Sequence, residues 1–161
     1  MLFRSGCSSI NGMIYMRGQR RDYDGWAART GDPDWTWERC LPHFLRHEDH
    51  WRGASEHHAA PGFDPKGQRP GGEWRVERQR LSWEVLDAFS EAAQQAGIPA
   101  TDDFNRGSNE GVGYFEVNQR SGLRWNASKA FLRPVVARPK DRKSTRLNSS
   151  HSQQSRMPSS A

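Results

Sequence analysis

Apolar residues recur at helical spacing from Trp37 to Leu45, which predicts an amphipathic helix that starts after Asp34 or Thr36. The stripe consists of Trp37, Leu41, Phe44 and Leu45. Asp34 or Thr36 stands before the stripe as the cap, and both residue types favour helix N-termini. Pro42 lies inside the segment, where its ring and its missing amide hydrogen disturb a helix. We therefore expect a helix that Pro42 kinks or whose first turns it restricts.

A second stripe at the same spacing predicts the most regular helix of the chain. Its members are Leu86, Phe89, Ala93 and Ala96. Ser82 precedes the stripe as the N-cap, and Gly97 ends it, with Ile98 beyond as the apolar contact. Both ends of this helix therefore carry sequence signals.

Alternating positions predict two strand regions. In Glu73–Leu81, Trp74 and Val76 alternate with charged residues, which suits a half-buried strand whose charges lie on its solvated side. The segment Gly111–Gly122 is interpreted as a strand and a turn. These strands cannot complete a sheet, so their partners must come from elsewhere.

Three other segments have little periodicity. Residues 22–36 mix Asp, Gly, Pro and Trp and are interpreted as a loop with short turns. Residues 52–72 are rich in Gly, Pro and His and are interpreted as a long surface loop. Asn126 is expected to cap a short helix that Pro134 stops. The predicted elements together indicate an α+β chain.

Residues 141–161 differ in character from the rest of the chain, because they are almost all polar and show no apolar period. Residues 141–151, DRKSTRLNSSH, are what the adapter DNA of short-read sequencing libraries encodes. Residues 155–161, SRMPSSA, are what a later part of that adapter encodes, and the residues between leave room for a sample index. We therefore interpret residues 141–161 as a non-native, disordered tail and exclude them from fold reasoning.

The basic charge lies mainly in this tail. The formal net charge of +5 and the pI of about 9.7 favour nucleic acid, because a basic chain gains affinity for phosphate by counterion release. Residues 141–161 hold four Lys or Arg and one Asp, which makes +3, so residues 1–140 carry only +2. We expect no nucleic-acid partner. The alternative is a small basic module without enzymatic activity, in which Arg and Trp side chains grip single-stranded nucleic acid.

The number of cysteines and the hydropathy of the chain bear on the cellular compartment of the protein. Two cysteines do not make a disulfide framework, and no stretch is apolar for long enough to form a transmembrane segment or a signal peptide. A reduced, cytoplasmic protein is therefore expected. The hydrophobic share is only 34%, yet the chain has seven Trp. This balance suggests a piece of a larger fold, with aromatic faces meant for neighbours.

The stretch SGCSSINGMIYMRG, residues 5–18, combines tiny polar residues with an apolar run. A turn of Gly, Cys and Ser can bring backbone N–H groups and hydroxyls close to an anion. Asn11 could offer its amide to the edge of a ring, and Gly12 would let a flat ligand touch the backbone. Taken alone, a turn of small residues is more often only a turn.

Longer motifs extend this signal. GCSSINGMIYMRG followed by DYDGWA resembles the flavin-contacting signature of the glucose-methanol-choline (GMC) oxidoreductases, most closely the choline-dehydrogenase-like branch. The resemblance continues through LPHFLRHEDHW, GEWRVERQRLSWEVLDAF and AGIPATDDFNRGSNEGVGYFEVNQRSGLRWNASKAFLRP, and it covers nearly all of residues 5–138. It implies an FAD-binding, Rossmann-like domain together with a substrate domain built on an antiparallel sheet with helices.

The resemblance also implies roles for six cofactor-binding residues. Those expected near the FAD pyrophosphate are Gly6, Cys7 and Ser8, and those expected to face the isoalloxazine ring are Asn11, Gly12 and Met13. Backbone dipoles there would help to hold the charge of the reduced flavin. Some relatives attach FAD through a histidine at the position of Ile10, and isoleucine cannot form that bond. The resemblance therefore implies non-covalent FAD and a small-molecule alcohol as substrate.

Two parts of a complete flavoenzyme are not found in the sequence. No G-x-G-x-x-G motif follows a strand, and the histidine base of the family would lie beyond this chain. We nominate no catalytic residue and expect an inactive, marginally folded fragment without a complete sheet. Residues 1–50 are assigned to the FAD-binding domain, and residues 51–140 to the FAD and substrate-domain region.

A metal site is the remaining alternative. Cys40, His43 and His47 share a helix face at spacings of three and four residues, as metal ligands can. No fourth ligand is evident, and Pro42 distorts the face, so a solvated surface is the better interpretation. The nearby histidines are given no stronger role; they are His50, His57 and His58. We nominate no metal ligand.

Overall fold

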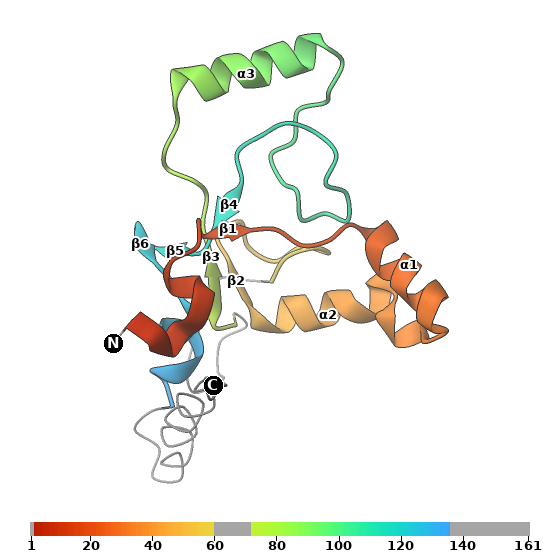
Figure 1. Ribbon diagram of the computed structural model, residues 1–161, viewed down its shortest axis with the longest axis vertical. Coiled ribbons are helices and arrows are strands. Elements are labelled where there is room, and N and C mark those ends of the chain that lie inside the picture. The colour runs from red at the N-terminus through yellow and green to blue at the C-terminus, as the bar shows by residue number, and fades with distance from the viewer. Residues whose placement is uncertain (1, 60–71, 136–161) are drawn as a thin grey trace, which may run out of the picture.

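The computed structural model describes residues 2–59 and 72–135. In chain order the elements are η1 (Leu2–Ser9), β1 (Ile14–Tyr15), α1 (Arg20–Thr30), η2 (Pro33–Trp35), α2 (Trp37–His47), β2 (Glu48–His50), β3 (Trp74–Val76), α3 (Glu84–Gln95), β4 (Glu116–Val117), β5 (Gln119–Arg120), β6 (Leu123–Arg124) and η3 (Ser128–Leu132). Figure 1 shows the strands near the centre, α1 and α2 on one side, and α3 at the end opposite η1 and η3. The described residues are α+β, as predicted. The predicted tail, residues 141–161, lies outside them, as does most of the predicted 52–72 loop.

In the described residues the strands form three sheets of two strands each. The pair β1–β4 is antiparallel, with Ile14 opposite Val117, and the pair β2–β3 is parallel, with Glu48 opposite Trp74. An isolated bridge from Glu77 to Val117 connects the end of β3 to β4. β5 and β6 form an antiparallel hairpin around a turn at Ser121 and Gly122, both of which have a positive φ. Pairs that are distant in sequence therefore hold the centre together.

The prediction of a loop over residues 22–36 is wrong. This region contains most of α1, and η2 follows it. The backbone N–H of Gln19 donates to Asp22 Oδ2 at 2.8 Å, which satisfies one end of α1, and Gly31 ends the helix in the left-handed conformation. Tyr23 is buried and packs against three aromatic side chains, Trp26, Trp37 and Phe44. This packing outweighs the poor helix propensity of the Asp and Gly residues.

The two predicted helices are confirmed. α2 begins after Thr36 and includes Pro42, and Trp37 is its buried residue. α3 ends as predicted, since Gly97 has a φ of 90° and the amide of Ile98 donates to the carbonyl of Ala93 at 3.0 Å. Its N-cap is Trp83 rather than Ser82.

Strand β3 is shorter than the predicted strand, and its charges do not all face solvent. Arg75 Nη1 donates to Asp49 Oδ1 at 2.9 Å, and Glu77 is buried. The prediction of a solvated charged side is therefore wrong for these two residues. The N-cap of η3 is Ala127, one residue after the predicted cap Asn126, although Asn126 Oδ1 accepts from the amide of Lys129 at 3.0 Å.

In the described part of the chain, no helix combines the length and the apolar character needed to cross a membrane.

Candidate functional site

The six predicted cofactor-binding residues lie together on residues 6–13, which comprise the C-terminal half of η1 and the segment that leads from it into β1; we call this stretch loop 6–13. They are Gly6, Cys7, Ser8, Asn11, Gly12 and Met13. Gly6 has φ 58° and ψ −150°, a conformation open essentially to glycine alone, and Met13 has a φ of 64°. A Cβ placed on Gly12 would meet no atom within 4 Å. The loop is therefore a surface turn with open space beside Gly12.

A second segment, residues 124–127, which we call the brace, contacts loop 6–13 although the two are far apart in sequence. Arg124, for example, lies 113 positions after Asn11. The Nη1 atom of Arg124 donates to the Ser8 carbonyl at 3.2 Å and to Asn11 Oδ1 at 3.0 Å. The amide of Ala127 donates to Ser8 Oγ at 3.1 Å. Sequence reasoning missed this brace and interpreted Asn126 only as a helix cap.

The other end of the loop is held by the strand layer. The amide of Asn118 donates to the carbonyl of Met13 at 2.7 Å, and Gln119 Nε2 contacts Met13 Sδ at 3.7 Å. Because Met13 directly precedes β1, the pairing of β1 with β4 fixes the position of the C-terminal end of loop 6–13.

Five buried residues close a ring of hydrogen bonds, which we call the polar ring. Its members are Arg17, Glu48, His58, Asp103 and Asn105. Arg17 Nη2 lies 2.5 Å from Glu48 Oε1, His58 Nδ1 lies 3.3 Å from both Glu48 carboxylate oxygens, and His58 Nε2 lies 2.8 Å from Asp103 Oδ2. The amide of Asn105 donates to Asp103 Oδ1 at 2.8 Å, and Asn105 Oδ1 accepts from the Arg17 amide at 2.8 Å. The ring joins the chain after β1 to β2 and to two loops.

The polar ring carries two positive and two negative charges. Burial opposes the charged form of His58, but the hydrogen bonds to Asp103 and Glu48 outweigh it and raise the His58 pKa to about 9. Burial likewise opposes the Asp103 carboxylate, yet the hydrogen bonds from His58 and the Asn105 amide lower the Asp103 pKa to about 2. For Glu48, the His58 hydrogen bond and the Arg17 charge overcome burial and lower the pKa. Since arginine stays protonated in proteins, the ring is balanced.

A second buried group lies beside the ring. His50 Nε2 is 3.0 Å from Glu116 Oε2, and the indole N–H of Trp51 donates to Glu116 Oε1 at 2.9 Å. Arg52 Nε also donates to Glu116 Oε1, at 3.2 Å, and Arg52 Nη1 donates to Asp102 Oδ2 at 2.7 Å. Burial opposes the Glu116 carboxylate, but the His50 hydrogen bond outweighs it and lowers its pKa. This group ties β2 to β4.

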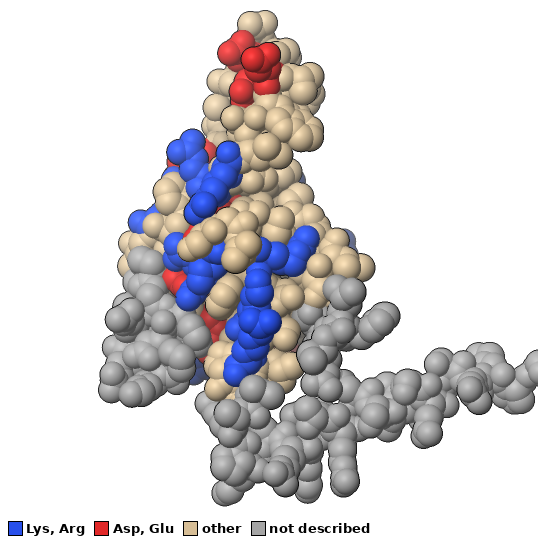
Figure 2. All heavy atoms as spheres, turned by 90° about the vertical axis from the view of Figure 1, so that its left-hand side faces the viewer, with Lys and Arg blue, Asp and Glu red and all other residues tan. Residues whose placement is uncertain are grey.

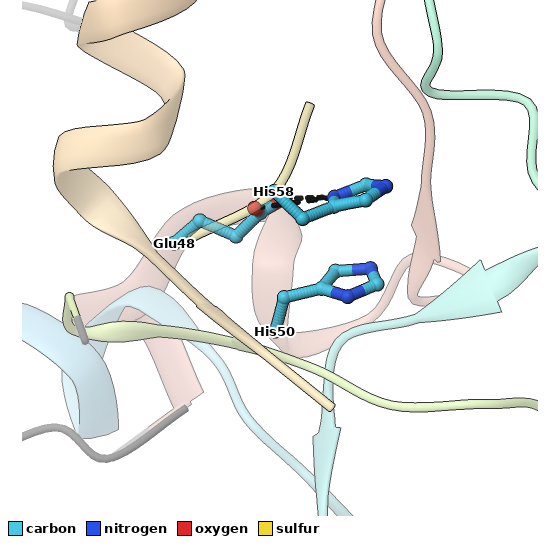
Figure 3. Close-up of side chains that lie close together, drawn as sticks. All are labelled: Glu48, His50 and His58. Atoms are coloured by element: carbon cyan, nitrogen blue, oxygen red, sulfur yellow. Dashed lines mark hydrogen bonds and ion pairs between the residues drawn. The ribbon is translucent and has the colours of Figure 1, made fainter. Parts of the chain in front are cut away.

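The two groups bring together ligand types that metals use. Glu48, His50 and His58 lie close together, as do His58, Asp103 and Glu116. Figure 3 shows the His50 and His58 rings one above the other, with the Glu48 carboxylate directed at His58. The ring centroids are 3.7 Å apart and the planes differ by 16°.

This geometry opposes a shared metal ion. A ring nitrogen binds a metal within its own ring plane, at about 2.0–2.1 Å for zinc, so parallel stacked rings cannot converge on one ion. In addition, His58 carries protons on both nitrogens when it is charged, and each already faces a carboxylate. The arrangement is an ion-paired, hydrogen-bonded core. His58 lies within the predicted surface loop of residues 52–72 but is buried, so that prediction is wrong for His58; His50 is buried as well.

The helix-face residues weighed as metal ligands lie elsewhere. Cys40 is half-buried and its Sγ contacts the Asp34 carbonyl at 3.7 Å, while His43 and His47 are exposed. They form no ligand cluster among residues 2–59 and 72–135. Cys7 and Cys40 are both free thiols.

Basic side chains spread over one face. Figure 2 shows Lys and Arg on the side of the molecule that carries β5 and β6, with acidic side chains gathered near α3. Two arginines of the β5–β6 region have partners within the chain. On β5, Arg120 Nη2 is 2.6 Å from Asp49 Oδ2, and Arg80, which lies beside Gly122, has its Nη2 atom 3.3 Å from Glu77 Oε2. The face is thus partly neutralised, which does not favour the nucleic-acid alternative.

Comparisons with known proteins agree on one family. The chain is 38% identical over 133 residues to the mitochondrial choline dehydrogenase of Homo sapiens, a match that covers 83% of this chain and 20% of that protein. The crystal structure of pyridoxine 4-oxidase from Mesorbium loti matches with a TM-score of 0.71 and 30% identity, over 83% of this chain and 25% of that one. An FAD-dependent oxidoreductase from Chaetomium thermophilum matches with a TM-score of 0.66 and 25% identity, over 83% and 23%.

The chain thus spans about a fifth of the length of the human relative. A family profile described as GMC oxidoreductase matches residues 5–149, which is most of the sequence. The chain therefore belongs to the GMC oxidoreductase family.

Proposed function

We propose that this chain is the flavin-facing part of an FAD-dependent oxidoreductase that oxidises the CH–OH group of a small-molecule alcohol. The observation that carries the proposal is loop 6–13, which combines a glycine-only backbone conformation at Gly6, open space at Gly12 and bracing from both sides. The family membership and the alcohol-oxidising relatives support it. When bound, the flavin would take up the hydride removed from the alcohol carbon.

The residues of loop 6–13 fit such a ligand. Asn11 is exposed and its amide is anchored through the oxygen, which leaves the amide nitrogen as a donor for a ring edge. The neighbouring Gly12 gives a flat ring access to the backbone. Gly6, Cys7 and Ser8 would lie by the pyrophosphate, and Gly12 and Met13 would accompany Asn11 at the isoalloxazine ring.

The FAD is proposed to be non-covalent. The side chain at the position of the attachment histidine is Ile10, which is 80% exposed and carries no nucleophilic atom. A flavin held by this chain should therefore be removable by denaturation and filtration.

The wider architecture belongs to the same proposal. Residues 1–50 would form part of a Rossmann-like FAD-binding domain, and residues 51–140 part of the region that leads into an antiparallel-sheet substrate domain. We assign no catalytic base, because the two buried histidines, His50 and His58, are engaged with carboxylates and are closed to substrate. Cytoplasmic localisation stays a prediction, and the human relative is a mitochondrial protein.

A titration of the 15N-labelled chain with FAD tests the proposal. We expect no flavin to copurify in stoichiometric amount, but millimolar FAD should shift the NMR amide signals of loop 6–13 in a saturable way. The variant Gly12→Val should remove these shifts by filling the space beside the loop. Gly25→Val is the matched control, since Gly25 on α1 is equally open. Shifts that are absent, or that spread evenly over the molecule, contradict the proposal.

A further inference from the structure

Arg124 fixes the orientation of one side-chain amide on loop 6–13. Its Nη1 atom donates to Asn11 Oδ1 at 3.0 Å, and the backbone N–H of Met13 donates to the same oxygen at 3.1 Å. A guanidinium and a backbone N–H can only donate, so the atom that faces them must be the amide oxygen. The Asn11 side chain is therefore held in one of its two flip states.

The opposite end of this amide carries two N–H donors. Asn11 is exposed, and within residues 2–59 and 72–135 its Nδ2 atom has no hydrogen-bond acceptor. The donors stand next to Gly12, where a Cβ would meet nothing within 4 Å. An oriented donor pair thus borders open space that a flat ligand can enter.

The residue that holds Asn11 is itself supported. Lys129 Nζ donates to the Arg124 carbonyl at 2.6 Å, and the Arg124 guanidinium also reaches the Ser8 carbonyl at 3.2 Å. The amide of Ala127 donates to Ser8 Oγ at 3.1 Å. Together with the contact to Asn11, these hydrogen bonds hold loop 6–13 at both Ser8 and Asn11. Arg124 can therefore order the loop before any ligand binds.

We propose that Arg124 is a positioning residue that presents the Asn11 NH2 group to a hydrogen-bond acceptor on the ring of a bound flavin, a carbonyl oxygen or an unprotonated nitrogen. This inference rests on the proposed function. A donor ordered in advance loses less conformational entropy on binding than a side chain that must first be arranged. Arg124 thus contributes to flavin affinity without touching the flavin.

Two substitutions separate a positioning role from a merely structural one. Arg124→Gln removes the brace and should weaken FAD binding about five- to tenfold, as expected for one oriented hydrogen bond. Asn11→Asp keeps an acceptor for Arg124, so the loop stays braced, but it replaces the NH2 donor by a second acceptor oxygen. It should weaken FAD binding at least as much while leaving the loop signals of the free protein in place.

Arg133→Gln is the matched control, because Arg133 is exposed and its substitution removes the same charge from the neighbouring helical turn. Its FAD affinity should stay within about twofold of the parent chain. An Asn11→Asp variant that binds FAD as well as the parent overturns the donor role. If Arg124→Gln and Arg133→Gln weaken FAD binding equally, the loss of a positive charge explains both effects, and the positioning role is overturned.

A ligand-free measurement keeps the inference distinct from the proposed function. NMR relaxation of the Asn11 side-chain NH2 group should show an ordered amide in the parent chain and a mobile one in Arg124→Gln. If the amide is ordered but FAD does not bind, the proposed function fails and the brace stands. If the amide of the parent chain is mobile, the positioning inference fails whatever FAD does.

Discussion

The centre of the molecule and helix α3 place charged and apolar side chains in opposite ways. The polar ring buries Arg17 and Glu48 with side-chain exposures of 1% and 0%. On α3, Phe89 is 66% exposed and Leu86 is 43% exposed, although both belong to the apolar stripe that predicts the helix. Only Ala93 of α3 is buried.

The difference shows which contacts this chain completes by itself. A buried charge is tolerated only when partners satisfy it, and here every member of the polar ring has them. Exposed apolar residues gather along α3 and the segment before it, in a groove that is lined by no charged side chain; the most exposed of them are Phe89, Leu81 and Trp83. The central polar contacts are closed within the described residues, whereas the α3 face has no cover among them.

Breaking the polar ring should have the largest effect. Glu48→Gln leaves Arg17 buried without its counter-charge and should lower the free energy of unfolding by about 3–5 kcal/mol. Glu38→Gln is the matched control, because the Arg20–Glu38 pair is exposed and should contribute at most about 1 kcal/mol. Urea unfolding followed by circular dichroism measures both. Similar losses for the two variants would erase the contrast between buried and exposed pairs.

The pH dependence of stability should be the next largest effect. The His58 pKa is raised to about 9, so its stabilising contribution is complete below its unfolded value near 6.5 and disappears as the pH rises through 9. The Asp103 pKa is lowered to about 2, so its contribution is complete above about pH 4 and disappears as the pH falls through 2. Stability should therefore be greatest between about pH 4 and 6.5 and should fall by about 3 kcal/mol toward pH 10.

Unfolding curves at a series of pH values measure this profile, and an NMR titration of the His58 ring locates its midpoint directly. His57→Gln serves as the control, since His57 lies outside the polar ring and its loss should leave the alkaline slope unchanged. A His58 midpoint near 6.5 would contradict the ion-paired description of the ring.

Changing the α3 face should have the smallest effect on stability. Phe89→Ser removes an aromatic ring that is already two-thirds exposed, so the free energy of unfolding should change by no more than about 0.5 kcal/mol. Val117→Ala, at a residue only 1% exposed, should cost more than about 1 kcal/mol. Phe89→Ser also makes the exposed α3 face less apolar, so light scattering should show that the variant stays monomeric up to a higher protein concentration than the parent chain. A large loss of stability in this variant would mean that α3 packs more closely than described.

The helices were predictable where apolar spacing and end signals agree. The stripe and Gly97 locate α3, and Thr36 locates the start of α2. The prediction fails for α1, because the Asp and Gly residues around Tyr23 suggest a loop. The helix is stabilised by the packing of Tyr23 against Trp37 and Phe44, which belong to another segment. Local propensity cannot report a contact between separate segments.

The candidate site was predictable only in part. Loop 6–13 follows from its small residues and from the family resemblance, and its role in FAD binding remains a proposal. The polar ring was missed because its members are single polar residues in different segments, and His58 lies in a stretch whose histidines suggest a solvated loop. Arg124 carries no local signal, since its partners Ser8 and Asn11 precede it by more than a hundred residues.

The polar ring also constrains the order in which the chain can assemble. Its five members come from four separate stretches between Arg17 and Asn105, and three of the residue pairs that it joins lie 31, 45 and 88 positions apart. The other two pairs, His58 with Glu48 and Asn105 with Asp103, lie 10 and 2 positions apart. Charged groups gain nothing from leaving water until their partners arrive, and contacts between distant segments form slowly because long loops must close first. The ring should therefore close late and all at once, so that the backbone amides of Arg17, Ala59 and Asn105 acquire protection from hydrogen exchange in a single step.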